Sequence, residues 1–441
     1  MAIRDELAHL LRRATFGPRV EELDAAERAG RDVTLANLLT PATPDTGAAR
    51  TPPPALPPDP MGLLGKEPPT DVRRKAMREQ RQMVESVMAW WIDRMVAADY
   101  QALEKLTYFW HGHWATSVEK VRFAQLMLSQ QQTMYRLGTG DFGVLAQAMV
   151  RDPALIYWLD GHKNTAKAPN ENLARELMEL FMLGIGHYTE ADVKAGARAL
   201  TGWIVERPKN SATFTAQRHD PGEKTILGKT GRFGTGEFVD LLLANEATPK
   251  FVTARLWFRY ASGEPIPADT HQRLIEAYGS GRDITAVLRA LFTDPAFNRT
   301  RGQLVKQPAE WAIGAMRQLG IRPGELPPPE QKQLLNTLRD LGQLPLDPPS
   351  VGGWSAGAAW LTTSATQLRL AAADMLASKA SPAAVQQLTD VPAAQRPEAL
   401  TRLLVIDRWT DRTRTVLADA AGGEPRRLLA LALGSPEYVV Q

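Results

Sequence analysis

The sequence contains no cysteine among its 441 residues. This absence excludes disulfide bonds, thiol nucleophiles, cysteine-bound iron–sulfur clusters and zinc sites built from cysteine. It fits a cytoplasmic and an exported protein equally well, so the compartment has to be predicted from other features. Any metal or acid–base site must use histidine, aspartate and glutamate side chains.

Long apolar runs are also missing, and no stretch is long and apolar enough to span a bilayer. The first residues, Met1-Ala-Ile-Arg-Asp-Glu, lead into an amphipathic stretch and not into the apolar core of a signal peptide. The chain as given is therefore predicted to be cytoplasmic, unless a leader has been removed from it.

The excess of charge of one sign is small. The formal net charge is +3 and the pI is near 9.0, which is a weak bias for so long a chain. Nucleic-acid-binding proteins usually carry a stronger basic footprint. We therefore expect no nucleic-acid partner.

Runs of β-branched residues are scarce, whereas Leu, Ala, Arg, Glu and Gln are abundant, which favours helices. The predicted fold is mainly α, a multi-helical globular bundle. Residues 206–236 differ because they are rich in Thr, Phe, Ile and Gly, and they predict a small irregular β-hairpin insertion. A chain of this length exceeds the size of one compact core, so two or three sub-cores are expected.

Four regions are expected along the chain. Residues 41–69 are dense in Pro, Gly, Ala and Thr, so they are predicted to be either disordered or wrapped over the surface, with a lid over a site as a third reading. The regions are 1–70 with amino-terminal helices and the Pro-rich loop, 71–205 with the helical core and the candidate site, 206–236 with the hairpin-like insertion, and 237–441 with helices packed on the core.

The helix predicted over residues 170–183 carries a carboxylate where an apolar residue is expected. At about 100° per residue, Glu176 falls inside the edge of the leucine-rich face. An ionised carboxylate on a buried face is unfavourable unless it is paired or binds a cation. Its neighbours Glu171 and Glu179 are explained by i,i+4 pairs with Arg175. Glu176 has no such pair within its helix. It is therefore either a site residue or one member of a buried ion pair with an arginine such as Arg198.

Residues 103–114 end in the aromatic sequence Tyr-Phe-Trp-His-Gly-His-Trp. On a continuous helix His113 joins the apolar face, whereas His111 points to the other side, so the two imidazoles would not share a metal ion. If Gly112 ended the helix, both rings could converge on one ion. The alternative is that His113 is a hydrogen-bonded core histidine among tryptophans.

Three further polar residues are candidates for the same site. His187 precedes a capping-box-like start and is expected near the ends of two helices, while His219 and Asp220 lie on the hairpin-like insertion. We predict Glu176, His113 and Asp220 as catalytic candidates. The candidate ligands of a divalent metal ion are His111, His113, Glu176, His187 and His219. His9, by contrast, is expected at the surface.

The usual signatures of nucleotide, flavin, serine-hydrolase and zincin sites are absent. The sequence has no Gly-x-x-x-x-Gly-Lys-Ser/Thr, no dinucleotide fingerprint after a strand, no Gly-x-Ser-x-Gly and no His-Glu-x-x-His. What remains is a set of His, Glu and Asp residues with aromatic neighbours.

Several motifs together resemble a large bacterial family, the domain of unknown function number eighteen hundred. The likeness runs from the Leu-Leu-Arg-Arg-Ala-Thr-Phe-Gly opening to the last helices, so it covers nearly the whole chain. The motifs that carry it are residues 103–117, 152–160, 170–184, 188–193, 197–203, 219–220 and 352–355.

The resemblance implies a genomic association with an exported phosphatase- or sulfatase-like protein. It also implies an exported or periplasmic location as an alternative to the cytoplasm for this chain. It implies no settled activity. The chain differs from the family pattern at Gly352, where a lysine is expected before Gly-Trp, and this difference weakens any role for a cation there.

Three functions are consistent with these residues. The first is a metal-dependent enzyme of hydrolase type, in which a metal-bound water is the nucleophile. The second is a non-catalytic partner of an exported phosphatase- or sulfatase-like enzyme, with the polar cluster as a buried network. The third is a redox protein with haem, iron or copper among the Trp, Met and His residues.

Overall fold

The computed structural model describes residues 3–65 and 67–441, and its secondary structure is mainly helical. In these residues the strands form two separate two-stranded antiparallel sheets. The predicted mainly α fold with a small β insertion is therefore confirmed. No helix in the described part of the chain combines the length and the hydropathy needed to cross a membrane.

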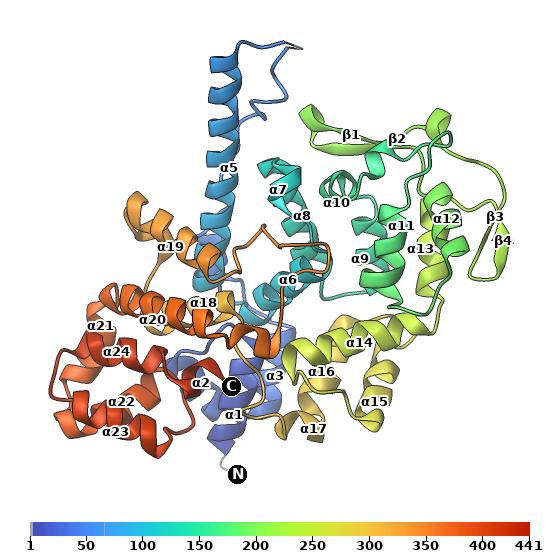
Figure 1. Ribbon diagram of the computed structural model, residues 1–441. Helices are drawn as coiled ribbons and strands as arrows, with labels where there is room; N and C mark the ends of the chain where they lie inside the picture. Colours follow the sequence, from blue (N-terminus) through green and yellow to red (C-terminus); the bar gives the residue numbers. More distant parts are fainter. Residues whose placement is uncertain (1–2, 66) are drawn as a thin grey trace.

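The amino-terminal helices lie at the base of the molecule, and α1 is buried along most of its length (Figure 1). His9 on α1 is only 1% exposed, and its Nε2 lies 3.1 Å from the carbonyl oxygen of Phe297. The surface position expected for His9 is wrong, because α1 is covered on several sides. The helices at the base are α1 (Ile3–Ala14), α2 (Val20–Ala29) and α3 (Arg31–Leu39). The short α4 (Thr46–Ala49) and the long α5 (Thr70–Ala97) follow in the chain.

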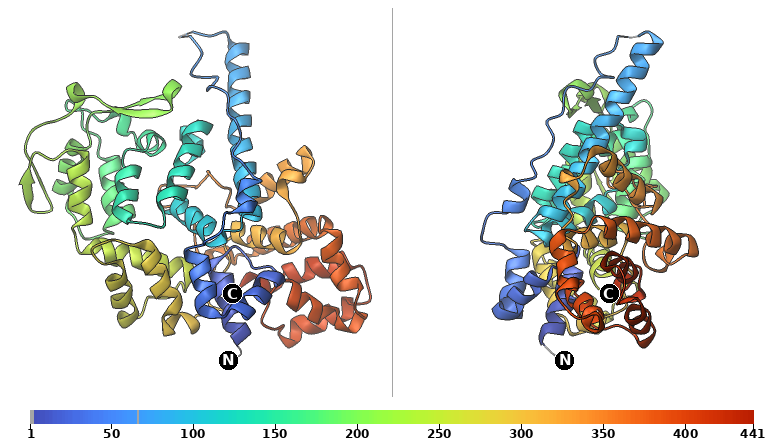
Figure 2. Two further views of the ribbon diagram at one scale, coloured as in Figure 1. Left: turned by 180° about the vertical axis from the view of Figure 1, so that it is seen from behind. Right: turned by 90° about the vertical axis from the view of Figure 1, so that its left-hand side faces the viewer.

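The Pro-rich segment before α5 follows the surface, which is one of the courses expected for it. The Trp90 indole N–H donates to the carbonyl oxygen of Thr51 at 2.9 Å, and the Gln80 amide donates to Asp59 at 2.9 Å. Helix α5 and this segment project well beyond the other helices (Figures 1 and 2).

Helix α6 occupies the centre, and nearly all of its side chains are buried. Tyr108 belongs to a large apolar cluster with α5 and α18, whereas Leu106, Phe109 and Trp110 belong to a second cluster with α9 and the helix around residue 180. The central helices are α6 (Gln101–His113), α7 (Val118–Val121), α8 (Ala124–Leu137), α9 (Phe142–Met149), α10 (Pro153–Trp158), α11 (Asn172–Glu176), the π-helix η2 (Leu177–Met182) and α12 (Glu190–Ala199).

The β insertion contains two hairpins where one was expected. Strand β1 (Trp203–Glu206) pairs with β2 (Ser211–Phe214), and β3 (Lys224–Ile226) pairs with β4 (Lys229–Gly231). The second turn has positive φ at Leu227 and Gly228, which matches the right-handed twist of paired strands. Irregular chain with a short 3-10 turn separates the two pairs.

The rest of the chain is helical and surrounds α6 from below and from one side (Figure 1). Its helices are α13 (Thr235–Leu243), α14 (Ala247–Tyr260), α15 (Ala268–Tyr278), α16 (Ile284–Thr293), α17 (Pro295–Asn298), α18 (Pro308–Gln318), α19 (Pro328–Asp340), α20 (Thr363–Ser378), α21 (Pro382–Thr389), α22 (Arg396–Leu403), α23 (Asp411–Ala420), α24 (Pro425–Leu433) and α25 (Pro436–Val439). Short 3-10 helices are η1 (Gly161–Lys163), η3 (Arg207–Lys209), η4 (Ala216–Arg218), η5 (Pro323–Glu325), η6 (Gly357–Trp360) and η7 (Ala393–Gln395).

The loop of residues 341–362 connects α19 with α20 and packs on the carboxyl end of α6. Gly353 has a φ of 81°, and a Cβ at this position would lie 2.4 Å from the carbonyl oxygen of Gly112. Only glycine allows both this conformation and this approach. The contact brings Val351, Gly352 and Trp354 next to α6, where the candidate site lies.

Candidate anion-binding pocket

The two histidines at the end of α6 face different parts of the molecule. Helix α6 is unbroken through Gly112 and ends at His113. The Nε2 of His111 accepts a hydrogen bond from the backbone N–H of Leu346 at 2.9 Å, whereas the Nε2 of His113 lies 2.9 Å from the carbonyl oxygen of Phe181. The two rings therefore do not converge, as the continuous-helix interpretation predicted.

These contacts define the protonation of both rings. A carbonyl oxygen only accepts, so His113 carries its proton on Nε2, and its buried Nδ1 is an acceptor without a partner in the described residues. The Phe181 carbonyl is among the last of its helix, which lack partners along the helix, so His113 caps this end. Burial lowers the pKa of both His111 and His113 to about 3, and for His113 the nearby Arg255 adds to the effect.

Because three histidines are buried, we expect the protein to lose stability on acidification. Burial lowers the pKa of His9, His111 and His113 to about 3 from the ordinary histidine value of 6.5. Between pH 3 and 6.5 the unfolded chain binds more protons than the folded chain, so stability rises with pH in this window and is lost as pH falls through it. The midpoint of thermal unfolding should drop between pH 7 and pH 4.5.

Carboxylates also titrate below pH 5, so a variant is needed to isolate the histidines. His111→Gln keeps an acceptor for the Leu346 N–H but does not ionise. It should show a flatter dependence of the unfolding midpoint on pH than the parent protein. Equal slopes for the two proteins would contradict a neutral, buried His111.

Glu176 lies where α11 passes into the π-helix η2. The backbone N–H groups of Leu183 and Gly184 both donate to the carbonyl oxygen of Met178, and Gly184, with a φ of 86°, ends the helix as expected. Glu176 is half-buried and has no hydrogen-bond or ion-pair partner in the part of the chain that the structure describes. Burial raises its pKa, and the charge of Glu179 raises it further.

The charges near Glu176 pair differently from the predicted scheme. Arg175 contacts Glu171 at 3.1 Å, as predicted, but its second partner is Glu190 at 2.6 Å and not Glu179. Glu179 instead accepts a hydrogen bond from the hydroxyl of Tyr188. The scheme failed because Tyr188, in the loop after Gly184, and Glu190, at the start of α12, contact this helix and take these partners.

Arg198 does not reach Glu176 or Glu179, because it pairs with Asp220 at 2.6 Å. The hydrogen bond from Arg198 lowers the pKa of the Asp220 carboxyl group. The Nδ1 of His219 lies 3.0 Å from the carbonyl oxygen of Thr201. His219 and Asp220 thus fasten the β insertion to the carboxyl end of α12.

The five predicted metal ligands are not brought together. In residues 3–65 and 67–441, no group of three or more His, Asp or Glu side chains is arranged so that it could hold a metal ion. Among the described residues, His113 and His187 of the predicted site line a common pocket, which Glu179 also lines.

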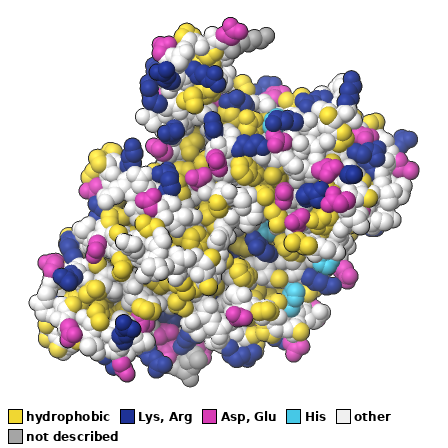
Figure 3. Space-filling view, viewed as in Figure 1, with side chains coloured by type: hydrophobic (Ala, Val, Ile, Leu, Met, Phe, Trp, Pro, Cys, Tyr) yellow, Lys and Arg dark blue, Asp and Glu magenta, His cyan; other side chains and the backbone are white. Residues whose placement is uncertain are grey.

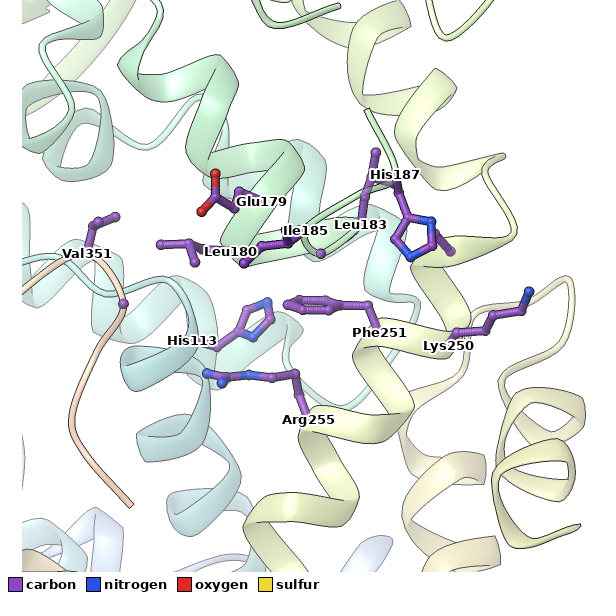
Figure 4. Close-up of a pocket in the computed structure, with 13 residues that line it drawn as sticks. His113, Glu179, Leu180, Leu183, Ile185, His187, Lys250, Phe251, Arg255 and Val351 are labelled. Atoms are coloured by element: carbon purple, nitrogen blue, oxygen red, sulfur yellow. The ribbon is translucent and has the colours of Figure 1, made fainter. Parts of the chain in front are cut away.

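This pocket has a volume of about 450 Å³ and lies between η2, α14 and the loop before α20 (Figure 4). Its walls are largely apolar, and viewed as in Figure 1 this face shows hydrophobic side chains with His, Lys and Arg among them (Figure 3). Its apolar lining includes Leu180, Leu183, Phe251 and Val351.

Arg255 places a positive charge on the wall of the pocket. It comes from α14, one turn after Phe251, and Figure 4 shows its guanidinium end beside the His113 ring. Its Nε is buried without a hydrogen-bond partner, and no carboxylate of the described residues forms an ion pair with it. Burial lowers the Arg255 pKa, yet a guanidinium stays protonated in proteins. The pocket therefore contains a partly buried, uncompensated positive charge.

The sequence interpretation missed Arg255 because it concentrated on residues 103–114 and 170–203. A signal existed in α14: Phe251, Arg255 and Arg259 follow at intervals of four residues, so they share one side of the helix. Arg259 also falls within the buried face of α14, as an arginine with an apolar neighbour on each side. Glu176 was selected as a charged residue on a buried helix face. The same criterion would have selected Arg259.

The sequence profile of a family described as "Protein of unknown function (DUF1800)" matches residues 9–440 of the chain. The chain belongs to the DUF1800 family. A search of curated proteins and a search of solved structures both find no significant match. The DUF1800 description assigns no activity.

Proposed function

We propose that this DUF1800 protein binds a small anionic molecule that also has an apolar part. The observation that carries the proposal is Arg255, a partly buried guanidinium without an acidic partner on the wall of an apolar pocket. Removing a charge from water without compensation is unfavourable. A bound anion supplies the missing compensation.

The pocket defines the class of ligand. A guanidinium binds carboxylate, phosphate and sulfate oxygens through two parallel hydrogen bonds. Phe251, Leu180 and Leu183 supply an apolar wall for the rest of the molecule, and the volume of about 450 Å³ falls in the range of small-molecule sites. The neutral His113 ring adds a hydrogen-bond acceptor, its Nδ1, for a hydroxyl or amide N–H of the ligand.

The other hypotheses from the sequence have less geometric support. A metal-dependent hydrolase or a haem, iron or copper protein would use histidine nitrogens, but the Nε2 atoms of His111 and His113 are engaged by backbone groups. A non-catalytic partner of an exported phosphatase- or sulfatase-like enzyme stays a prediction, and ligand binding without catalysis is compatible with it.

Paired ligands that share an apolar part, of which one carries an anionic group and the other is neutral, test the proposal. Thermal unfolding should be followed with benzoate against benzamide, hexanoate against hexanamide, and phenyl phosphate against phenol. A ligand that binds only the folded chain stabilises it by RT ln(1 + [L]/Kd), about 2.7 kcal/mol at one hundred times Kd. We expect the anions to raise the midpoint and their neutral analogues to have no effect. Equal shifts within each pair would contradict a charged recognition group.

Gly352 offers a gain-of-affinity test of the same pocket. It lines the pocket, and a Cβ at this position would meet only the Ser350 hydroxyl oxygen at 3.6 Å. Gly352→Lys should place a second cation near Arg255 and lower the Kd for phenyl phosphate roughly three- to tenfold, the effect of a net hydrogen bond or ion pair. Isothermal titration calorimetry measures this change, with Gly352→Ala as the matched control. Equal Kd values for both variants would contradict an anion beside this loop.

A further inference from the structure

Arg255 also lines a second, smaller cavity. It has a volume of about 60 Å³, and its lining includes Tyr108 from α6, Arg255 and Arg259 from α14, and Trp354 from the loop before α20. The Trp354 ring stacks on Tyr108 with centroids 5.5 Å apart. A single water needs roughly 10–15 Å³ of such space, so this cavity has room for a group of several atoms.

The side chains that line this cavity carry buried polar atoms without a partner, and each of these atoms is an N–H donor or a hydroxyl. Within the described residues, four buried atoms have no partner: Arg255 Nε, Arg259 Nη2, Trp354 Nε1 and the Tyr108 hydroxyl oxygen. Arg259 is 8% exposed and Tyr108 is 2% exposed, so both are almost fully removed from solvent. No Asp or Glu side chain lines the cavity.

Buried polar atoms in folded proteins are nearly always hydrogen-bonded, and here four such atoms belong to side chains that line one cavity. The Nη1 of Arg259 is already held by the Glu310 carboxylate at 3.0 Å, which aims the remaining face of the guanidinium elsewhere. One water molecule has two lone pairs and cannot accept from all four groups, and several waters would leave the charge of Arg255 without compensation. An oxyanion has enough lone pairs, and its charge suits two guanidinium groups.

We infer that this cavity holds the oxyanionic group of the ligand, a carboxylate, phosphate or sulfate, between Arg255 and Arg259, with Tyr108 and Trp354 as additional donors. The inference rests on the proposed function and extends it, because it separates the site into two parts. The head of the ligand lies in the small cavity, and its apolar part lies in the larger pocket, with Arg255 lining both.

Tyr108→Phe tests the inference with little risk to folding. The hydroxyl has no partner within the described residues, so its removal should leave the unfolding midpoint unchanged or raise it. The Kd for phenyl phosphate, benzoate and inorganic phosphate, measured by isothermal titration calorimetry, should rise about tenfold. Tyr278→Phe is the matched control, because Tyr278 is 3% exposed, has an unpartnered hydroxyl and lines neither cavity.

Trp354→Phe provides a second variant that keeps an aromatic ring on Tyr108 but removes the N–H donor. It should also weaken binding of all three anions. Inorganic phosphate tests the small cavity alone, and a tighter Kd for phenyl phosphate than for inorganic phosphate assigns the apolar part to the larger pocket.

The outcomes separate the inference from the proposed function. If Tyr108→Phe and Trp354→Phe both bind the three anions with parental affinity while Arg255→Gln does not, the inference is overturned and the proposed function stands. If Arg255→Gln also keeps parental affinity, both are overturned. Weaker binding in all three variants, with Tyr278→Phe unchanged, supports both.

Discussion

Replacing Glu310 by glutamine should lower the free energy of unfolding by about 3–5 kcal/mol, the usual effect of removing one member of a buried ion pair. Glu310 has no exposed surface and accepts hydrogen bonds from Lys105, from Arg259 at 3.0 Å and from the Gln441 amide at 2.9 Å. Burial alone would raise the Glu310 pKa, but the charges of Lys105 and Arg259 lower it to about 2. Removal of this carboxylate leaves two cations in the core without compensation.

Urea unfolding followed by circular dichroism measures the effect. Glu246→Gln is the matched control, because Glu246 is 88% exposed and its contact with Lys250 is a surface pair. Such pairs contribute roughly 0–1 kcal/mol. A loss below about 1 kcal/mol for Glu310→Gln would contradict the view that this carboxylate neutralises the buried cations between α6, α14 and α18.

Replacing Arg255 by glutamine should raise the Kd of the anionic ligand about 10- to 100-fold, since a charge-assisted, two-point hydrogen bond contributes roughly 1.5–3 kcal/mol. Arg255→Lys should recover part of the affinity, because an ammonium keeps the charge but not the planar two-point geometry. Isothermal titration calorimetry with phenyl phosphate measures both values. Lys250→Gln, at the rim of the same pocket, should change the Kd only slightly.

Stability distinguishes a binding role of Arg255 from a structural one. The guanidinium has no ion pair or hydrogen bond to its Nε in the described residues, so Arg255→Gln should leave the free energy of unfolding unchanged or raise it. A loss of more than about 2 kcal/mol, the range of a broken core contact, together with a normal Kd would contradict the binding role.

Local signals in the sequence predicted much of the helical framework. Thr189 and Asp192 form the expected capping box, and Gly184 ends the preceding helix with a positive φ. The continuous-helix reading of residues 103–114 placed His111 and His113 on different sides, and α6 has this form. These features depend on residues three to four apart, and such information is contained in a short stretch of sequence.

The pocket could not be predicted in the same way, because it depends on contacts between distant segments. His111 is held by Leu346 and His113 by Phe181, and neither pairing has a local signature. Arg255 is a candidate binding residue because it has no acidic partner in the described residues. Only the packed structure shows which side chains surround it. His9 was assigned to the wrong environment for a related reason, since the sequence does not show how many sides of α1 are covered.

The position of a bound anion is the most direct test of the account. Crystals of the protein grown with 4-iodobenzoate combine a carboxylate, an apolar ring and an anomalous scatterer in one ligand. The account predicts carboxylate oxygens within about 2.7–2.9 Å of the Arg255 guanidinium and an iodine peak in the pocket lined by Phe251 and Leu183. An occupied ligand bound elsewhere, with no density at Arg255, would contradict it.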